Sequence, residues 1–156
     1  MSKAGVVGGF GSKEALQLAA LDRAIEVFRR EVVERGAKEP AGLPRLRAYG
    51  DAWIDYLSRD VFPGGCFLTS ASAEFDGRSG PVRDAVDDAL DLWRRALERE
   101  ATIAIEAGDL PSDADAADAA FAMLGVALAL NQNRQLHRDR RATRRARRLM
   151  ARTLGA

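Results

Sequence analysis

Apolar residues recur every three or four positions along most of this chain, which is the period of an α-helix that buries one face. The first run of this kind consists of Leu18, Leu21, Ile25, Phe28 and Val32. Ser12 precedes the run as a favourable N-cap residue, Glu14 places an anion near the positive end of the helix dipole, and Gly36 follows the run. The pattern therefore predicts a helix over residues 12–36.

A second amphipathic run begins after the loop at residues 40–44, which contains two prolines and a glycine. Its apolar side is rich in aromatic residues and consists of Leu46, Tyr49, Trp53, Tyr56 and Leu57. The run stops at the turn-forming segment Phe62-Pro63-Gly64-Gly65. We predict a helix whose aromatic side packs against another element.

Residues 66–75 form a short apolar segment that is closed by Asp76-Gly77. Its length and its serine and threonine content are compatible with a helix or a strand, and we expect the helix. A helix-start signal follows at Gly80-Pro81. The helical period then returns in Val82, Val86, Leu90, Trp93, Leu97, Ala101 and Ile105. This run predicts a long helix that ends near Gly108.

Two more helices are predicted after the break at Leu110-Pro111, and Ser112 is the expected N-cap of the first. From residue 119 to residue 130 this helix is apolar on all sides, so it needs cover from more than one neighbour. The last helix, residues 140–154, has one apolar face. One small subunit offers little cover, so we expect both helices to form a homodimer interface. The expected interface residues are Phe121, Leu124, Gly125, Leu128, Ala142, Ala146, Leu149 and Met150.

These patterns predict an all-α fold, a bundle of five or six helices, because no alternating strand pattern interrupts them. The length of 156 residues suits one domain, and 47% hydrophobic residues exclude a disordered tail. No apolar run reaches the roughly 18 residues of a membrane span, and the first residues do not resemble a secretory signal. Cys66 is the only cysteine, so no intrachain disulfide forms. We expect a cytoplasmic protein without contact to a membrane.

The charges are distributed unevenly, although the net charge is only +1. Residues 134–152 contain nine arginines and a single carboxylate, Asp139. A basic run of this kind can bind nucleic acid, but it lacks interleaved aromatic residues and keeps an apolar stripe. We therefore favour a solvated face, paired with the acidic residues 113–118.

Candidate catalytic and metal-binding groups have simpler explanations. Four aspartates share one helical face, namely Asp84, Asp87, Asp88 and Asp91. Arg94 and Arg95 follow Asp91 at ion-pairing distance along a helix, so a solvated, partly paired face explains the stripe. His137 is the only histidine and has no second ligand nearby in the sequence. The glycines Gly5, Gly8, Gly9 and Gly11 match no phosphate-binding motif. We expect no enzyme activity, no metal and no cofactor.

Several aromatic and apolar residues could line a cavity for a small molecule or could form an ordinary packed core. These candidate ligand-binding residues are Trp53, Tyr56, Leu57, Phe62, Cys66, Phe67, Ser70, Trp93 and Leu97. Cys66 follows two glycines at a predicted helix start, where a helix dipole favours the thiolate. Cysteine is also among the most frequently buried residues, so a sensing thiol and a core residue remain alternatives.

Three segments of the chain together resemble the tetracycline repressor (TetR) family of transcriptional regulators. Gly11-Ser12-Lys13-Glu14-Ala15-Leu16 is similar to the end of that family's helix-turn-helix head. Residues 62–75 and 80–86 look like the sensor domain of one subgroup. The resemblance covers nearly the whole chain. It implies a helical homodimer, a small apolar or aromatic effector bound between helices, and DNA as the partner of the complete family.

The same resemblance divides the chain into residues 1–36, a remnant of the head with its connecting helix, and residues 37–156, the ligand-binding and dimerisation domain. Ser12 and Lys13 are then the candidate DNA-phosphate contacts. The first two head helices and a Tyr-x-His-Phe-like stretch of the family pattern are missing, so we expect no operator-specific binding by this chain alone. The alternative is a head-less helical dimerisation protein without DNA-binding activity, which either regulates nothing on its own or forms inactive heterodimers with a complete paralogue.

Overall fold

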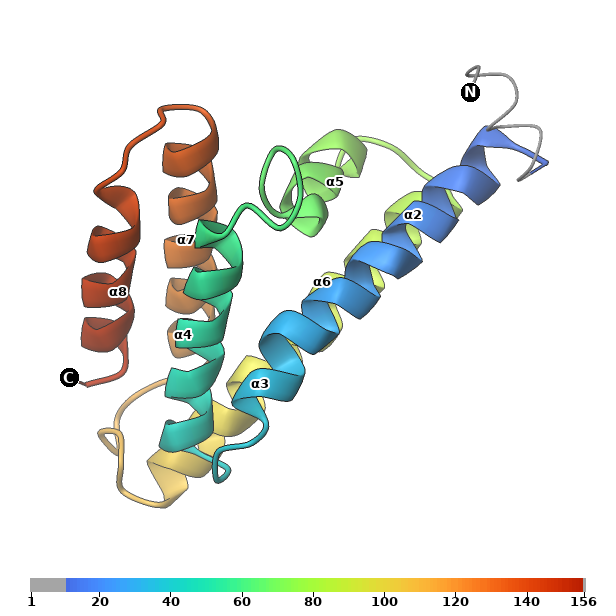
Figure 1. The fold of residues 1–156 in the computed structure, drawn as a ribbon. Coiled ribbons are helices and arrows are strands. Elements are labelled where there is room, and N and C mark those ends of the chain that lie inside the picture. Colours follow the sequence, from blue (N-terminus) through green and yellow to red (C-terminus); the bar gives the residue numbers. More distant parts are fainter. Residues whose placement is uncertain (1–10, 156) are drawn as a thin grey trace.

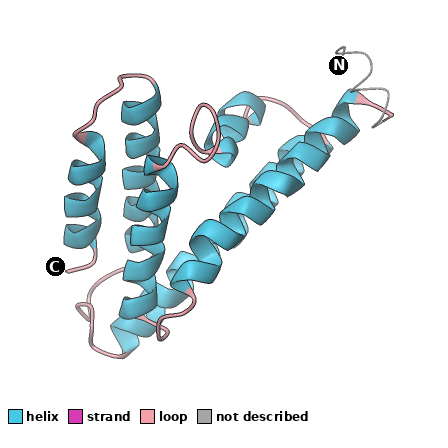
Figure 2. Cartoon of the chain, viewed as in Figure 1, coloured by secondary structure: helices cyan, strands magenta, loops and turns pink. Residues whose placement is uncertain are grey.

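The computed structural model describes residues 11–155, and within this range every regular element is a helix (Figure 2). The elements are α2 (Lys13–Phe28), a π-helical segment η1 (Arg29–Val33), α3 (Glu34–Gly36), α4 (Leu43–Ser58), α5 (Phe67–Phe75), α6 (Pro81–Glu106), α7 (Ala116–Gln135) and α8 (Ala142–Thr153). The all-α prediction is confirmed. Residues 67–75 are helical, so the alternative of a strand there is wrong.

The helices form two groups, and α6 of the first group contacts α4 of the second (Figure 1). The helix made by α2, η1 and α3 runs along α6, and the short α5 lies against both α2 and α6. In the second group α4, α7 and α8 lie side by side and contact one another. The contacts between α4 and α6 and between α6 and α7 join the groups into one hydrophobic core.

The first helix has the predicted extent, but it is not α-helical throughout. Ser12 caps it, since its side chain accepts a hydrogen bond of 3.0 Å from the backbone N–H of Ala15. The π-helical turn at Arg29–Val33 interrupts the α-helix without ending it, and Val32 inside that turn is fully buried. A π-helical turn accommodates one extra residue in the helix, which sequence periodicity does not reveal. Residues 1–10, which hold most of the expected head remnant and Gly5, Gly8 and Gly9, lie outside the described residues.

The N-cap of α7 is Asp115, so the prediction of Ser112 at this position is wrong. The Asp115 carboxylate accepts hydrogen bonds from the backbone N–H groups of Ala117 at 2.7 Å and Asp118 at 3.2 Å. Residues 111–114 form a turn closed by a hydrogen bond from the Ala114 N–H to the Pro111 carbonyl. Because of this turn, the helix begins three residues later than predicted. The negative charge of the Asp115 carboxylate also interacts more favourably with the positive end of the helix dipole than the neutral hydroxyl of Ser112 would.

The apolar face of α8 is covered within the subunit. Ala142, Ala146 and Met150 are each buried, because α8 packs on α4 and α7. Contacts within the subunit therefore account for the burial of these three residues, and their place at a dimer interface stays a prediction. Leu149 on the same helix remains partly exposed.

The arginines of α8 find their carboxylates elsewhere than predicted. Arg147 pairs with Asp55 at 2.5 Å and Asp51 at 3.3 Å, both on α4, and Arg145 pairs with Asp139 at 3.3 Å. Residues 113–118 are not among these partners, so the predicted pairing of the two segments is wrong. The solvated face itself is confirmed, since all three Arg145 and Arg147 ion pairs are partly exposed.

One fully buried carboxylate joins α6 to the start of α4. Glu100 accepts a hydrogen bond of 2.9 Å from the Gly42 N–H and pairs with Arg99 at 2.7 Å and Arg45 at 3.4 Å. Burial acts to raise the pKa of Glu100, but the Gly42 N–H, Arg99 and Arg45 outweigh it and hold the pKa below its ordinary value of 4.5. A carboxyl group with a lowered pKa stabilises the fold above the pKa of the unfolded chain, and that contribution disappears as the pH falls through the folded value.

The Glu100→Gln variant is therefore expected to lose about 1–3 kcal/mol of unfolding free energy at pH 7, because it removes the charge from two ion pairs. Its stability should also fall less steeply than that of the wild type between pH 5 and pH 3, which urea titrations at several pH values would show. Glu106→Gln, an exposed position on the same helix, is the matched control. Equal losses in both variants would contradict the assigned role of Glu100.

Candidate ligand-binding cavity

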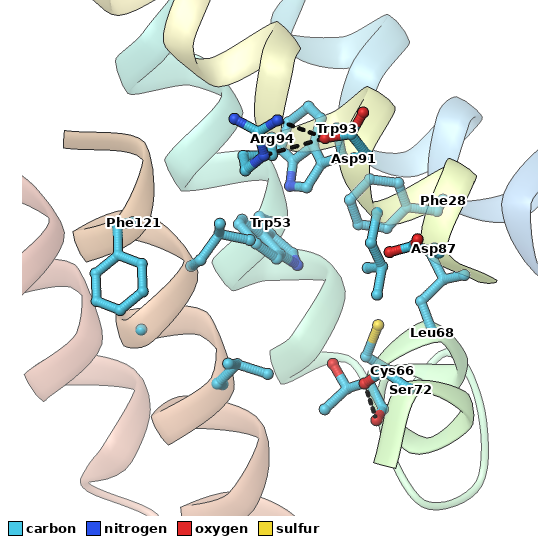
Figure 3. A pocket seen from close by; sticks show the side chains of 15 residues that line it. Phe28, Trp53, Cys66, Leu68, Ser72, Asp87, Asp91, Trp93, Arg94 and Phe121 are labelled. Atoms are coloured by element: carbon cyan, nitrogen blue, oxygen red, sulfur yellow. Dashed lines mark hydrogen bonds and ion pairs between the residues drawn. The ribbon is translucent and has the colours of Figure 1, made fainter. Parts of the chain in front are cut away.

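A cavity of about 370 Å³ lies where α4, α5, α6 and α7 meet, and Phe28 of α2 closes one side of it (Figure 3). Small-molecule sites in proteins have volumes of roughly 300–1,000 Å³, so this cavity suits a small ligand. Most of its wall is apolar. Leu68 of α5, Leu90 of α6 and Leu124 of α7 contribute aliphatic surface from three directions.

The aromatic part of the wall is formed by three rings from three helices. The ring centroids of Trp53 on α4 and Trp93 on α6 are 5.4 Å apart, and Phe28 lies 5.2 Å from Trp93 and 6.0 Å from Trp53. All three pairs meet edge to face, with interplanar angles of 80–86°. Edge-to-face contacts of this kind add stability beyond the burial of area, so the three rings support one another across the helices.

The two tryptophans bring buried polar atoms to this wall. The indole Nε1 of Trp53 and that of Trp93 are closed to solvent, and neither has a hydrogen-bond partner among the described residues. In Figure 3 the Trp53 nitrogen is on the edge of the ring turned toward Leu68 and Cys66, and the Trp93 nitrogen is turned toward Trp53. Buried indole N–H groups normally have a partner, so both positions require an explanation.

Cys66 stands at the start of α5 and is held from α7. Its backbone N–H donates a hydrogen bond of 2.9 Å to Oδ1 of Asn131, and its side chain is buried at the edge of the cavity (Figure 3). Burial, and then the neighbouring Cys66, raise the pKa of Tyr56 above its ordinary value of 10, so Tyr56 stays a neutral phenol. The sensing role of Cys66 stays a prediction.

Charged residues occur only at the rim among the residues that line the cavity, and each has a partner. Arg94 pairs with Asp91 and Glu98, and the hydrogen bond from Arg94 is the largest cause that lowers the pKa of Asp91. Arg95 also contacts Asp91, at 2.7 Å. Asp87, the other rim carboxylate, pairs with an arginine one helical turn earlier on α6 at 3.2 Å. The predicted ion-paired face of α6 is thus confirmed.

The predicted ligand-binding residues divide into three groups. Trp53, Cys66 and Trp93 line the cavity. Three others, Tyr56, Leu57 and Leu97, are buried in the packed core and do not line it. The remaining residues lie outside this cavity. Phe67 and Ser70 line a separate hollow of about 190 Å³ between α2, α5 and α6. The ring centroid of Phe62 is 6.1 Å from that of Phe67.

Several lining residues were missed or were assigned to another role. Phe28 was read as part of the first helix's core face, and Leu90 as part of the long helix's stripe. The α7 residues Phe121, Leu124, Gly125 and Leu128 were expected at a dimer interface, and they also line the cavity. A helix that is apolar on all sides was the signal that α7 serves two surfaces.

The outer face of α7 keeps exposed apolar side chains. Phe121 is 77% exposed, Leu128 49% and Leu149 of α8 40%. The interface prediction therefore stays open for these residues. Ser12 and Lys13 lie at the N-terminus of α2, outside the cavity, where Ser12 acts as the helix cap and Lys13 is exposed.

The described residues show neither a cluster of metal-ligating side chains nor a helix suited to a membrane. No group of three or more histidine, cysteine or carboxylate residues within residues 11–155 is arranged to hold a metal ion, and His137 is exposed between α7 and α8. None of the helices in this range combines the length and the apolar character needed to cross a membrane.

Comparisons with known proteins agree with the helical architecture. Residues 42–150 match the family described as "Tetracyclin repressor-like, C-terminal domain". A TetR transcriptional regulator from Chloroflexus aurantiacus J-10-FL superimposes with a TM-score of 0.83 at 23% identity, over 94% of this chain and 74% of that one. The structure of AibR in complex with isovaleryl coenzyme A and operator DNA gives a TM-score of 0.73 at 23% identity, over 85% of this chain and 69% of that one. None of the curated proteins compared with the chain matches it.

Proposed function

The chain belongs to the tetracycline repressor-like (TetR) family, and we propose that it is a sensor domain that binds a small apolar or aromatic effector in the cavity between α4, α5, α6 and α7. The observation that carries the proposal is the cavity itself, about 370 Å³ with a largely apolar wall from five helices. The proposed activity is ligand binding and not catalysis of a reaction. We further propose that the chain acts as a homodimer through α7 and α8.

The helix α7 offers a physical connection between effector and dimer. Leu124 and Leu128 line the cavity, while Phe121 and Leu128 expose apolar surface on the same helix. A ligand that prefers one position of α7 shifts the population toward the dimer geometry compatible with that position. In a complete regulator this change of spacing would alter how two DNA-binding heads fit an operator.

AibR shows that a protein of this fold accommodates an acyl coenzyme A and operator DNA. Free acyl and aromatic compounds are thus the first candidates for the present cavity, because its rim carries no unpaired arginine among the described residues to hold a nucleotide phosphate. We expect no operator-specific binding by this chain alone, since Ser12 is engaged as a helix cap and phosphate contacts from Lys13 carry no sequence information.

Effector binding is expected to quench tryptophan fluorescence, because the only two tryptophans, Trp53 and Trp93, both line the cavity. A screen of aromatic and acyl compounds should also raise the melting temperature, since a ligand at 100 times its Kd stabilises the folded state by about 2.7 kcal/mol.

The control for this screen is a pair of variants on α5. Ser72→Phe fills the cavity and should abolish quenching, whereas Ser70→Phe fills the separate hollow and should leave it unchanged. Absence of both quenching and stabilisation across the screen would refute the proposed function, as would wild-type affinity in Ser72→Phe.

A further inference from the structure

Two buried hydrogen-bond donors on the cavity wall have no partner within the described residues. Trp53 and Trp93 are each only 6% exposed, and their indole N–H groups are the unpaired donors. A buried polar group without a hydrogen bond destabilises the folded protein relative to one that is satisfied. Phenylalanine at either position would supply an aromatic ring without an unpaired donor.

The neighbouring rings offer only partial compensation. Trp53, Trp93 and Phe28 meet edge to face, and an N–H group that points at an aromatic face forms a weak hydrogen bond. An oxygen acceptor forms a much stronger one. Both nitrogens are closed to solvent, so a bound oxygen reaches them only when the rings turn about their side-chain bonds. An oxygen acceptor bound to either indole N–H therefore changes the chemical environment of that indole proton.

The rim of the cavity does not favour a charged ligand. Asp87 and Asp91 are paired with arginines, and Arg94 is shared between Asp91 and Glu98. A cation would meet no unpaired carboxylate there, and an anion would meet no unpaired guanidinium. Moving a charge from water into an apolar cavity without a counter-ion is strongly unfavourable, so the wall disfavours both anions and cations.

From the unpaired donors and the paired rim we infer that the cavity takes a neutral, apolar molecule with a carbonyl-type oxygen, which accepts a hydrogen bond from the indole N–H of Trp53 or Trp93. The inference rests on the proposed sensor function and specifies the chemistry of its effector. Ketones, esters, lactones and amides belong to this class. The aliphatic surface of Leu68, Leu90 and Leu124 encloses the rest of the molecule.

The test compares two probes of similar shape, propiophenone with its carbonyl and propylbenzene without it. The protein has two tryptophans, so its ¹H–¹⁵N spectrum contains two indole signals, which the Trp53→Phe variant assigns. We expect propiophenone to move one indole proton downfield, as an N–H···O hydrogen bond does, and propylbenzene to leave both without a downfield shift. The ketone should bind about five to ten times more tightly, the gain of one net hydrogen bond.

Two variants identify the donor. Trp53→Phe and Trp93→Phe keep an aromatic ring and remove the N–H, so one of them should lose the preference for propiophenone while it still binds propylbenzene. The charged compounds 3-phenylpropanoate and 3-phenylpropylammonium test the neutral character of the site and should bind at least ten times more weakly than the ketone.

The outcomes separate this inference from the proposed function. Equal binding of both neutral probes without a downfield indole shift overturns the inference and leaves the cavity as a ligand site. A preference for the ketone that survives in both tryptophan variants, or tighter binding of a charged probe, overturns it as well. If none of the four compounds binds, the result counts against the sensor function itself.

Discussion

Replacing Gly65 with alanine is expected to lower the unfolding free energy by about 2–5 kcal/mol, the combined cost of left-handed backbone strain and a lost buried hydrogen bond. Gly65 has a φ of +89°, and a Cβ there would lie 2.2 Å from Oδ1 of Asn131 and 2.8 Å from Cγ of Gln135. Oδ1 of Asn131 is the atom that accepts the Cys66 N–H, so the added methyl group displaces the contact that holds α5 to α7.

Gly64→Ala is the matched control for this variant. Its φ of +86° imposes the same backbone strain, but no atom outside its neighbours lies within 4 Å of the added Cβ. Urea unfolding should therefore show a loss of only about 1–2 kcal/mol for this control. If both alanines cost the same, the contact with Asn131 is not what requires glycine at position 65.

The Leu128→Glu variant is expected to convert a homodimer into a monomer, with an increase of about 100-fold or more in the dissociation constant. Leu128 is 49% exposed on α7, two helical turns from the 77% exposed Phe121, and an interface would cover both. Burying a carboxylate against an apolar partner surface without a counter-ion costs several kcal/mol. Sedimentation or light scattering at micromolar concentration would measure the change.

Leu92→Glu provides the comparison, because Leu92 is 72% exposed but lies on α6. This variant should remain dimeric, and circular dichroism should show that both variants are folded. A monomeric wild-type chain at micromolar concentration would disprove the proposed dimer. Dissociation of Leu92→Glu instead of Leu128→Glu would move the interface from α7 to α6.

Periodicity predicted those features that depend on one helix at a time. The stripe from Val82 to Ile105 located α6 because a helix must bury the same face along its length. It did not reveal what covers a given face. Ala142, Ala146 and Met150 were assigned to a partner subunit, whereas α4 and α7 of the same chain cover them. A helical wheel shows that cover is needed but not which chain supplies it.

The candidate site was predictable to the same limited extent. Trp53 and Trp93 were identified because large aromatic side chains on two helices need a common partner surface. Leu97, one turn from Trp93, was placed at the site but fills the core. Whether a side chain borders a void or a neighbour depends on how closely the helices pack, within less than the width of one methyl group. The pattern of residue types carries no information at that scale.

The π-helical turn at Arg29–Val33 is the place where the first helix can change its length by one residue. Each residue of an α-helix advances the chain by about 100° around its axis, so a deletion within regular α-helix turns one end of the helix against the other. A π-helical turn takes up one extra residue locally, so the segments on both sides of it keep their buried faces. Deletion of the exposed Arg30 would therefore restore regular α-helical winding and leave Leu21 and Ala24 in the core. The same deletion between Ala24 and Phe28 would instead turn the preceding residues by about 100° away from α6.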